Sequence, residues 1–579
     1  MSRTLLALAG FLLPACLSGR PPWLGDDYAI VSGGTIYPTA DAQPVEALLI
    51  EDGRVRALGP RAEIEAEAGE LVERARGFRF ELEVRRIELA GGTAVPGLVD
   101  AHGHLEGLGE ALENVDLVGC TSLAELVERV VARTASQPAG TWILGRGWDQ
   151  TLWPGQEFPT HAALSARVPD HPVFLERIDG HAAFVNAKAL ELAGLLAADA
   201  VKASVAGGRI VLDAEGRPTG VFVDAATLRV AQRIPAPDHD TRVRRVLAAQ
   251  RALLAVGLVG MHDMGTAPET FAVLRELERA GRLKLRVASY VWANEGLGAH
   301  GRVRVVDDPG RKLRIVGAKL MVDGALGSRG AALLEPYADA PDELGLLQMT
   351  PEVYAKRLAE VVAAGLQPAT HAIGDRGNRL VLDAYDWQFH GRVASYEDGL
   401  RPRLEHAQVV APADWPRFER LGVIPSMQPT HATSDMRWAE ARLGSERIAG
   451  AYAWRRLAGP HAPLALGSDF PVESPNPLAG LYAARTRQDA SGNPAGGWLP
   501  EQRLDGVAAL AGFTTGSAYA AHEEQRRGKL LPGFAADLTV LDLDPIHCEP
   551  HALLGARVLA TIVDGELVYS VLPAEHSAN

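Results

Sequence analysis

Ala94-Val95-Pro96-Gly97-Leu98-Val99-Asp100-Ala101-His102-Gly103-His104 is the stretch that decides how this chain folds. It is an apolar run that ends in two histidines separated by one residue. If the run is a strand, residues two apart point to the same face, so the imidazoles of His102 and His104 project together from its C-terminal end. Two imidazoles in this arrangement suit the binding of one metal ion.

Later strand-like runs end in four more residues that could take part in a metal site: Lys319, His371, His406 and Asp469. Taken singly, each has a simpler explanation. A salt bridge to Asp323 would account for Lys319, core or loop packing for the two histidines, and a helix cap for Asp469. Taken together with the His-x-His pair, the four residues favour one shared site.

The spacing of these residues predicts a barrel of alternating strands and helices. Helical periods in 123–133 and 354–364 separate the strand-like runs, and strands separated by helices imply a parallel sheet. Each interval between Lys319 and Asp469 can hold one or two strand–helix units of about 30 residues. The interval from His104 to Lys319 is longer and predicts an insertion. In such barrels the active site lies at the C-terminal strand ends, where all six residues are placed.

The two ends of the chain differ from this middle part. Residues 27–93 alternate short β-branched runs with turns, and residues 523–575 return to the same pattern. Asp52-Gly53 and Asp564-Gly565 are each typical of a tight hairpin turn. We therefore expect an α/β fold: a distorted (β/α)8 TIM barrel over 94–522 with an insertion at roughly 105–250, plus a small β-sandwich domain built from both chain ends.

The composition narrows the class of function. A hydrophobic content of 47% and a charged content of 22% are ordinary for a soluble globular enzyme. The formal net charge of −14 argues against a nucleic-acid partner, because nothing would offset repulsion from phosphates. Cys16, Cys120 and Cys548 lie far apart and fit neither a disulfide framework nor a zinc knuckle.

Residues 1–22 have the features of an export leader. Arg3 is followed by an almost wholly apolar stretch over 4–13, which is too short to span a bilayer. Leu13-Pro14-Ala15-Cys16 resembles a bacterial lipobox, although Pro14 departs from the usual pattern. We expect an exported protein, periplasmic or anchored to a bacterial membrane by lipid on Cys16. A plain signal peptide or a misassigned start codon would also explain the segment.

Finer motifs resemble one known family. The six positions look like the metal centre of the amidohydrolase superfamily: His-x-His on strand 1, lysine on strand 4, histidines on strands 5 and 6, and aspartate on strand 8. Other stretches resemble its amidohydrolase-3 branch, which includes the YtcJ-like proteins and N-substituted formamide deformylases. The matching stretches are Gly145-Arg146-Gly147-Trp148-Asp149, 177–186, Asp323-Gly324-Ala325-Leu326-Gly327-Ser328-Arg329, Gly467-Ser468-Asp469-Phe470-Pro471-Val472, and Gly528-Lys529-Leu530 with Pro532-Gly533.

The resemblance implies a metal-dependent hydrolase of a carbon–nitrogen bond other than a peptide bond, such as that of a small N-acyl or N-formyl amine, acting through a metal-activated hydroxide. The metal ligands would be His102, His104, Lys319, His371, His406 and Asp469, with Asp469 also the catalytic base. One or two divalent ions are expected, zinc first, and Lys319 could carry a carbamate that bridges them. Ester or lactone hydrolysis, ring deamination, and a non-catalytic surface binding lipoprotein remain alternatives.

Residues outside the metal centre receive weaker assignments. Five are candidates for substrate binding: Trp148, Asp149, His181, Asp323 and Arg329. Core packing explains Trp148 equally well. His262 and Asp263 stand at another strand end, where a supporting or structural role is expected. The predicted partner is a small-molecule substrate, with no nucleic acid, no membrane contact beyond the lipid anchor, and a homodimer left open.

Overall fold

An eight-stranded parallel sheet forms the centre of the molecule. The computed structural model describes residues 24–135, 137–177, 182–196, 208–300, 311–389 and 399–573. The strands of this sheet run in the order β19-β18-β17-β16-β15-β14-β13-β6. In chain order they are β6 (Leu98–Gly103), β13 (Leu258–Thr266), β14 (Arg286–Trp292), β15 (Leu313–Met321), β16 (Gln367–Ala372), β17 (Arg403–His406), β18 (Ile424–Met427) and β19 (Ala465–Leu466).

The two ends of this sheet meet at a seam. Past the end of β19, the Asp469 amide donates to the His102 carbonyl (2.7 Å), and the His104 amide donates to the Phe470 carbonyl (2.9 Å). These two bonds link the first and last strands, so the sheet forms a nearly closed barrel. The predicted barrel fold is thereby confirmed.

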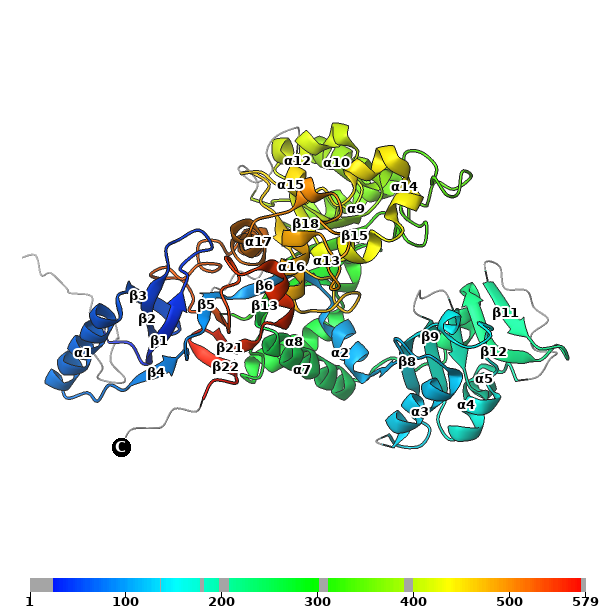
Figure 1. The fold of residues 1–579 in the computed structure, drawn as a ribbon, viewed down its shortest axis with the longest axis horizontal. Coiled ribbons are helices and arrows are strands. Elements are labelled where there is room, and N and C mark those ends of the chain that lie inside the picture. The colour runs from blue at the N-terminus through cyan, green and yellow to red at the C-terminus, as the bar shows by residue number, and fades with distance from the viewer. Residues whose placement is uncertain are drawn as a thin grey trace, which may run out of the picture.

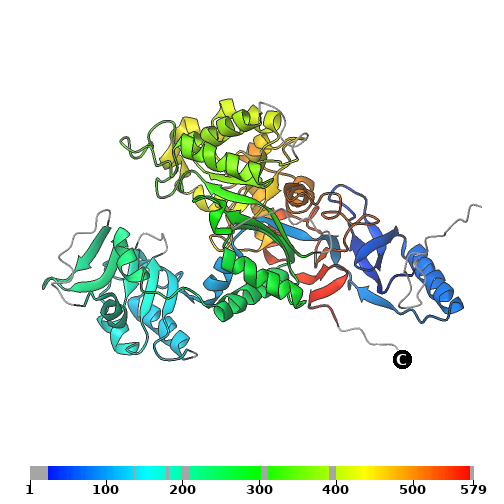
Figure 2. The same cartoon turned by 180° about the vertical axis from the view of Figure 1, so that it is seen from behind.

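Helices cover the outside of the barrel (Figures 1 and 2). They include α2 (Leu105–Glu113), α7 (His239–Ala255), α8 (Pro268–Arg279), α9 (Pro351–Ala363), α10 (Asp375–Gln388), α12 (Trp415–Leu421), α13 (Pro429–Asp435), α16 (Pro477–Thr486), α17 (Gly506–Phe513) and α18 (Thr515–Ala520). Helix α9 shows how the sequence specifies them. Its N-cap Thr350 accepts from the Val353 amide, and Tyr354, Leu358 and Val361 are buried at helical spacing.

The apolar run before His102 is two strands rather than one. Residues Thr93–Pro96 form β5, which pairs with β20 (Leu538–Leu541) in the β domain, and β6 begins after Gly97. A side chain at Gly97 would come within 2.5 Å of the Val259 side chain. Glycine therefore lets the chain pass closely from one sheet into the other. The two histidines keep their place at the end of the barrel strand.

Strands from both chain ends form one sheet. Its order is β22-β21-β20-β5-β1-β2-β3, with β4 beside β1, and it comprises β1 (Tyr28–Ile36), β2 (Val45–Glu51), β3 (Arg54–Gly59), β4 (Val84–Glu88), β21 (Val558–Val563) and β22 (Glu566–Ser570). Asp52 and Gly53 form the β2–β3 turn with φ values of 48° and 74°, and Asp564-Gly565 forms the β21–β22 turn. Apolar side chains of both ends share one core that includes Leu48 and Leu538.

Helix α1 (Arg61–Gly77) was not expected from the sequence of this region. Only Ile64, Ala68, Leu71 and Ala75 of this helix are buried, so its apolar stripe is one side chain wide and interrupted by alanine. Such a stripe produces a weak helical period. The helix covers one face of the β domain, where its side chains pack with those of Ile30 and Leu49.

A second sheet is inserted after α2. It has the order β11-β12-β10-β9-β8-β7 and comprises β7 (Val115–Asp116), β8 (Ile143–Trp148), β9 (Val173–Arg177), β10 (Ala182–Val185), β11 (Gly208–Leu212) and β12 (Pro218–Asp224). Its helices include α3 (Leu123–Thr134), where the sequence period predicts one. The inserted sheet stands beside the barrel and has its own apolar cores (Figure 1).

Helices α2 and α7, which precede and follow this sheet, pack into the barrel core through residues such as Leu108 and Val246. The compact inserted unit is therefore shorter than the 105–250 interval, because its two flanking helices belong to the barrel layer.

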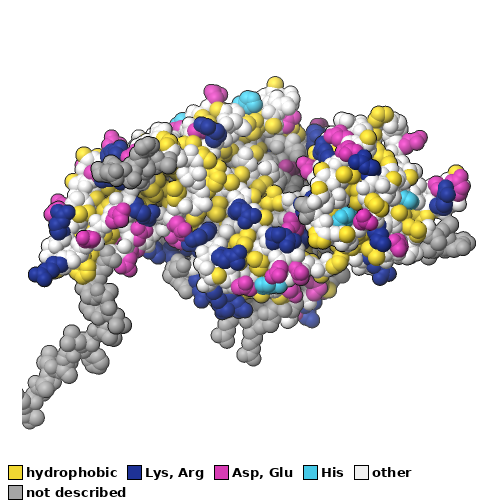
Figure 3. Space-filling view, turned by 90° about the horizontal axis from the view of Figure 1, so that it is seen from below, with side chains coloured by type: hydrophobic (Ala, Val, Ile, Leu, Met, Phe, Trp, Pro, Cys, Tyr) yellow, Lys and Arg dark blue, Asp and Glu magenta, His cyan; other side chains and the backbone are white. Residues whose placement is uncertain are grey.

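Basic and acidic side chains are interspersed on the face shown in Figure 3. Within the described ranges, no helix combines the length and the apolar content that crossing a bilayer requires. The predicted leader over 1–22, including Cys16, lies outside the described residues.

Candidate metal centre

All six predicted ligands lie at the C-terminal ends of the barrel strands. His102 lies near the end of β6 and His104 directly follows it. Lys319 and His371 lie near the ends of β15 and β16, His406 ends β17, and Asp469 follows β19. His406 and Asp469 have positive φ values of 73° and 62°. Histidine and aspartate enter this region more readily than most residues. At both positions the left-handed turn changes the direction in which the chain leaves its strand.

His102 is held from behind by a carboxylate. Its ring is fully buried, and Nδ1 lies 2.6 Å from Glu405 Oε2, to which it donates. Since the carboxylate fixes the proton on Nδ1, the lone pair of Nε2 faces the centre. Burial, followed by the charge of Lys319, lowers the pKa of His102 well below its ordinary value. The ring is therefore neutral, which is the form that binds metals.

His406 and His371 complete the histidine cluster. His406 Nδ1 lies 2.9 Å from Gln428 Oε1, which again directs Nε2 inward. The His406 ring centre is 4.6 Å from that of His102 and 4.5 Å from that of His371. Burial lowers the pKa of His371 to about 3 and that of His406 well below its ordinary range. The centre thus contains several neutral imidazoles close together.

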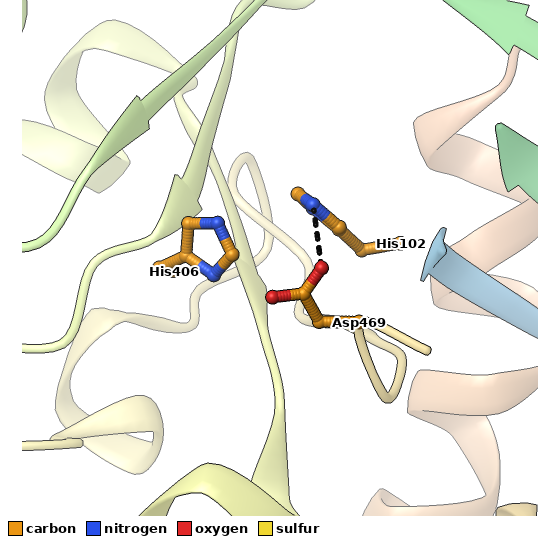
Figure 4. A group of neighbouring side chains, drawn as sticks. All are labelled: His102, His406 and Asp469. Carbon is orange, nitrogen blue, oxygen red and sulfur yellow. Dashed lines mark ion pairs between the residues drawn. The ribbon is translucent and has the colours of Figure 1, made fainter. Parts of the chain in front are cut away.

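Asp469 lies beside His102 and His406 (Figure 4). Its Oδ1 is 3.0 Å from His104 Nε2 and 3.5 Å from His102 Nε2. Burial opposes ionisation of the carboxyl group, but the neighbouring histidines outweigh it and hold its pKa well below the ordinary value. Ligand atoms of His102, His406 and Asp469 all lie within 4.8 Å of one another.

Lys319 lies in the same group of residues. Its Nζ is 3.2 Å from His102 Nε2, and burial lowers the pKa of the amine to about 8. The alternative salt bridge to Asp323 is not formed between these two described residues. The carboxylate of Asp323 instead accepts from the backbone amides of Ala332, Ile373 and Gly374 at 2.8–3.0 Å.

The donor set fits a divalent metal ion. Neutral imidazoles and an ionised carboxylate are the ligands that zinc and similar ions take, and the second nitrogens of His102 and His406 are already engaged by Glu405 and Gln428. His371 Nε2 is buried and has no hydrogen-bond partner among the described residues. It therefore has a lone pair or a proton that a ligand could satisfy.

Residues beneath the centre form a buried polar network. Arg403 and Glu405 are fully buried and paired at 2.8 Å, and Arg403 also donates to the Ala101 carbonyl at 2.7 Å. His262 lies 2.8 Å from Arg403, while Asp263 accepts from the Leu105 amide at 2.9 Å. The structure thus places His262 and Asp263 in supporting contacts.

The substrate-binding candidates are spread over several parts of the molecule. Trp148 is fully buried in the core of the inserted sheet and donates to the Leu175 carbonyl, which agrees with its alternative role in packing. Asp149 pairs with Arg177 at 2.7 Å in the same unit, and Arg329 pairs with Asp339 at 3.0 Å on a loop. Asp323 lies 3.6 Å from His371 and so supports the centre. His181 is outside the described residues.

Four residues of the site were missed by sequence reasoning: Arg403, Glu405, Gln428 and His431. Two charged residues at alternate positions of the short strand β17 are a local signal, because such a strand in a barrel is buried. Gln428 directly follows β18, where the rule on strand ends would have selected it, whereas His431 lies in the helix α13 that comes next.

Comparisons with known proteins agree with this geometry. A model of the amidohydrolase family matches residues 85–569. The putative amidohydrolase YtcJ of Bacillus subtilis (strain 168) is 30% identical over 547 residues, covering 93% of this chain and 99% of that protein. The N-substituted formamide deformylase of Arthrobacter pascens is 27% identical over 568 residues, covering 94% of this chain and 98% of that protein.

A solved structure is also similar. The crystal structure of an uncharacterised metal-dependent hydrolase from Pyrococcus horikoshii OT3 has a TM-score of 0.75 and 30% sequence identity, covering 90% of this chain and 99% of that one. The family match spans most of the sequence, and the histidines and aspartate meet at the strand ends as a metal centre requires. The chain therefore belongs to the amidohydrolase family and is a metal-dependent hydrolase.

Proposed function

We propose that this protein hydrolyses a carbon–nitrogen bond other than a peptide bond, in a small amide such as an N-acyl or N-formyl amine. The observation that carries the proposal is the place of Asp469, an ionised carboxylate surrounded by neutral imidazoles that can hold a metal. The similarity to an N-substituted formamide deformylase over 94% of the chain supports the choice of bond.

His102, His104, His371, His406 and Asp469 would hold the metal, with zinc favoured by the nitrogen and oxygen donors. A divalent ion bound there supplies a lowered pKa for water and polarisation of the scissile group.

Asp469 takes the proton of the attacking water as its oxygen bonds to the acyl carbon. The same carboxyl then returns the proton to the leaving nitrogen as the carbon–nitrogen bond breaks. The products are a carboxylic acid and an amine, so atoms and charges balance.

Lys319 is proposed to react with carbon dioxide. The nitrogen of the neutral amine bonds to the carbon of CO2 and releases one proton to water, which gives a carbamate with one negative charge. Burial supports this step, because a pKa of about 8 leaves more of the amine neutral than an exposed lysine has. The resulting oxygens would lie beside His102, whose Nε2 is 3.2 Å from the amine.

Asp469→Asn tests the proposal. Asparagine keeps the shape of the side chain but cannot accept the proton, so turnover should fall by about a hundred- to ten-thousand-fold. The wild type and the variant are assayed with excess zinc on matched N-formyl amines, N-acetyl amines, esters and lactones. The surface variant Asp213→Asn is the control, since Asp213 pairs with Arg217 in the inserted unit.

Faster wild-type turnover of the amides than of the matched esters supports carbon–nitrogen hydrolysis. Hydrolysis of esters or lactones alone would contradict it. Near-normal turnover by Asp469→Asn would remove Asp469 from the role of base.

A further inference from the structure

His431 is a buried histidine that the mechanism above does not use. It lies in α13, directly after β18, and thus at the same end of the barrel as the metal centre. Only 7% of the residue is exposed, and its ring stacks on that of His406 with centres 6.0 Å apart. Its Nε2 lies 3.7 Å from Asp469 Oδ2, on the side of the carboxylate that faces away from His104.

The Nε2 atom of His431 is buried and forms no hydrogen bond with any described residue. The 3.7 Å separation from Asp469 Oδ2 is longer than a hydrogen bond. A buried donor without a partner is destabilising, so such an atom in a native site requires an explanation, and a bound ligand provides one.

Contacts on the other side of the ring fix where the proton sits. Gln408 Nε2 lies 3.1 Å from His431 Nδ1, and Tyr452 donates to Gln408 Oε1 at 3.2 Å. Since the amide nitrogen can only donate, Nδ1 accepts and the ring proton is on Nε2. The Tyr452 hydroxyl also contacts Asp435, where burial raises the pKa of the carboxyl group.

We propose that His431 is a catalytic residue whose Nε2–H donates a hydrogen bond to the carbonyl oxygen of the scissile group. The inference rests on the proposed hydrolysis only in requiring attack on a carbonyl. The donor lies beside the carboxylate that takes the proton of water, so an acyl carbon placed near Asp469 brings its oxygen within reach of Nε2. As water adds, negative charge grows on that oxygen and the hydrogen bond strengthens, which lowers the barrier.

The kinetic test compares His431→Leu with His431→Gln. Leucine removes the donor, and kcat should fall by about a hundred- to a thousand-fold with a small change in KM. Glutamine offers an amide donor at a similar reach and should recover at least tenfold of the loss. His239→Leu, on the exposed surface of α7, is the control and should match the wild type. Each protein is assayed on the best wild-type substrate of the panel, amide or ester.

Two further readouts do not depend on turnover. Metal content measured by mass spectrometry should be the same in the wild type and both variants, because a protonated Nε2 is not a ligand. In the wild type labelled with nitrogen-15 at histidine, the signal lost in His431→Gln should be that of a ring protonated at Nε2.

Loss of metal from both variants, or a wild-type ring unprotonated at Nε2, would show a metal ligand and overturn the proposal. Equal kcat in His431→Leu and the wild type would overturn it too. Ester hydrolysis without amide hydrolysis would instead defeat the proposed carbon–nitrogen function, and the effect of His431 would still be measured.

Discussion

Glu405 shows how one residue behind a predicted metal ligand controls it. The carboxylate joins His102 on one side and Arg403 on the other, and none of the three side chains is exposed. Its negative charge therefore fixes the proton position on the imidazole and balances the positive charge of the buried Arg403 guanidinium. Pairing of this kind supports affinity for the metal more than it supports net stability, because desolvation offsets much of the attraction.

Glu405→Gln should weaken zinc binding by about ten- to a hundredfold. The amide retains the shape but removes the charge that holds the proton on His102 Nδ1. The dissociation constant is measured by competition with a chromophoric chelator, and the unfolding midpoint is recorded alongside to account for the unpaired Arg403. Wild-type zinc affinity in a folded variant would exclude this role for Glu405.

Lys319→Ala should lose most activity and regain part of it when acetate or propionate is added. A short carboxylate can occupy the space of the proposed carbamate and supply its oxygens. The readout is turnover as a function of acid concentration, with the wild type as the control that should not respond. Under carbon dioxide, the mass of the intact wild-type protein should also exceed that of Lys319→Ala by more than the difference between lysine and alanine, because the wild type carries an added CO2. Full activity without added acid would refute the carbamate.

The strand ends could be predicted from the sequence, but the contacts behind the ligands could not. An apolar run followed by histidine or aspartate is a local pattern, and it placed five residues at one end of the barrel, with Lys319 added as a lysine inside a strand-like run. Glu405 and His102 are separated by 303 residues, and their contact depends on how β6 and β17 meet across the barrel. The same limit applies to Trp148. A sequence motif suggested that it lies at the active site, but in the structure it packs in the core of the inserted sheet.

At the scale of elements, helix α2 links a ligand to the inserted sheet. Its N-cap is His104, and it crosses α7 at Gly109. A side-chain carbon at Gly109 would come within 2.3 Å of the Arg245 carbonyl oxygen, which is backbone and cannot move alone. The close crossing of these two helices thus fixes the helix that follows His104.

Gly109→Ala should destabilise the protein by about 1–3 kcal/mol through overpacking, despite the higher helix propensity of alanine. Displacement of α2 should also raise the zinc dissociation constant through His104. Gly107→Ala is the matched control on the same helix, because its nearest neighbours would lie at an ordinary 3.4 Å. Denaturant unfolding and chelator competition give the two quantities. Equal stability of both variants would show that the α2–α7 crossing tolerates the methyl group.

At the scale of the whole molecule, a buried ion network joins the barrel to the β domain. Arg286 of β14 donates to both carboxylate oxygens of Asp537 at 2.6 and 2.8 Å and also contacts Asp564. Lys312 lies 2.6 Å from the same Asp564. These contacts lie at the opposite end of the strands from the metal centre. We therefore expect them to stabilise the packing of the two domains and to have little effect on catalysis.

Asp537→Ala should destabilise the protein by about 3–5 kcal/mol, because it leaves the buried Arg286 without its main partner. Glu73→Ala is the control, since Glu73 and Arg76 are exposed and such a pair contributes about 0–1 kcal/mol. Thermal unfolding of both variants gives the comparison, and zinc content should stay at the wild-type level. A midpoint for Asp537→Ala equal to that of Glu73→Ala would contradict the importance of the network.

The seam of the barrel has a consequence for local opening of the fold. β19 is only two residues long, and the hydrogen bonds described across the closure join the backbones of His102, His104, Asp469 and Phe470. Three of these four residues, His102, His104 and Asp469, are predicted metal ligands, so an ion bound there would also hold the two edges of the sheet together. Removal of the metal by a chelator should therefore increase the rate of hydrogen exchange at the amides of His104 and Asp469. The amides of β14 and β15 should show a much smaller increase. Metal binding and closure of the barrel would then be one coupled equilibrium, which hydrogen exchange at the amides of His104 and Asp469 would report.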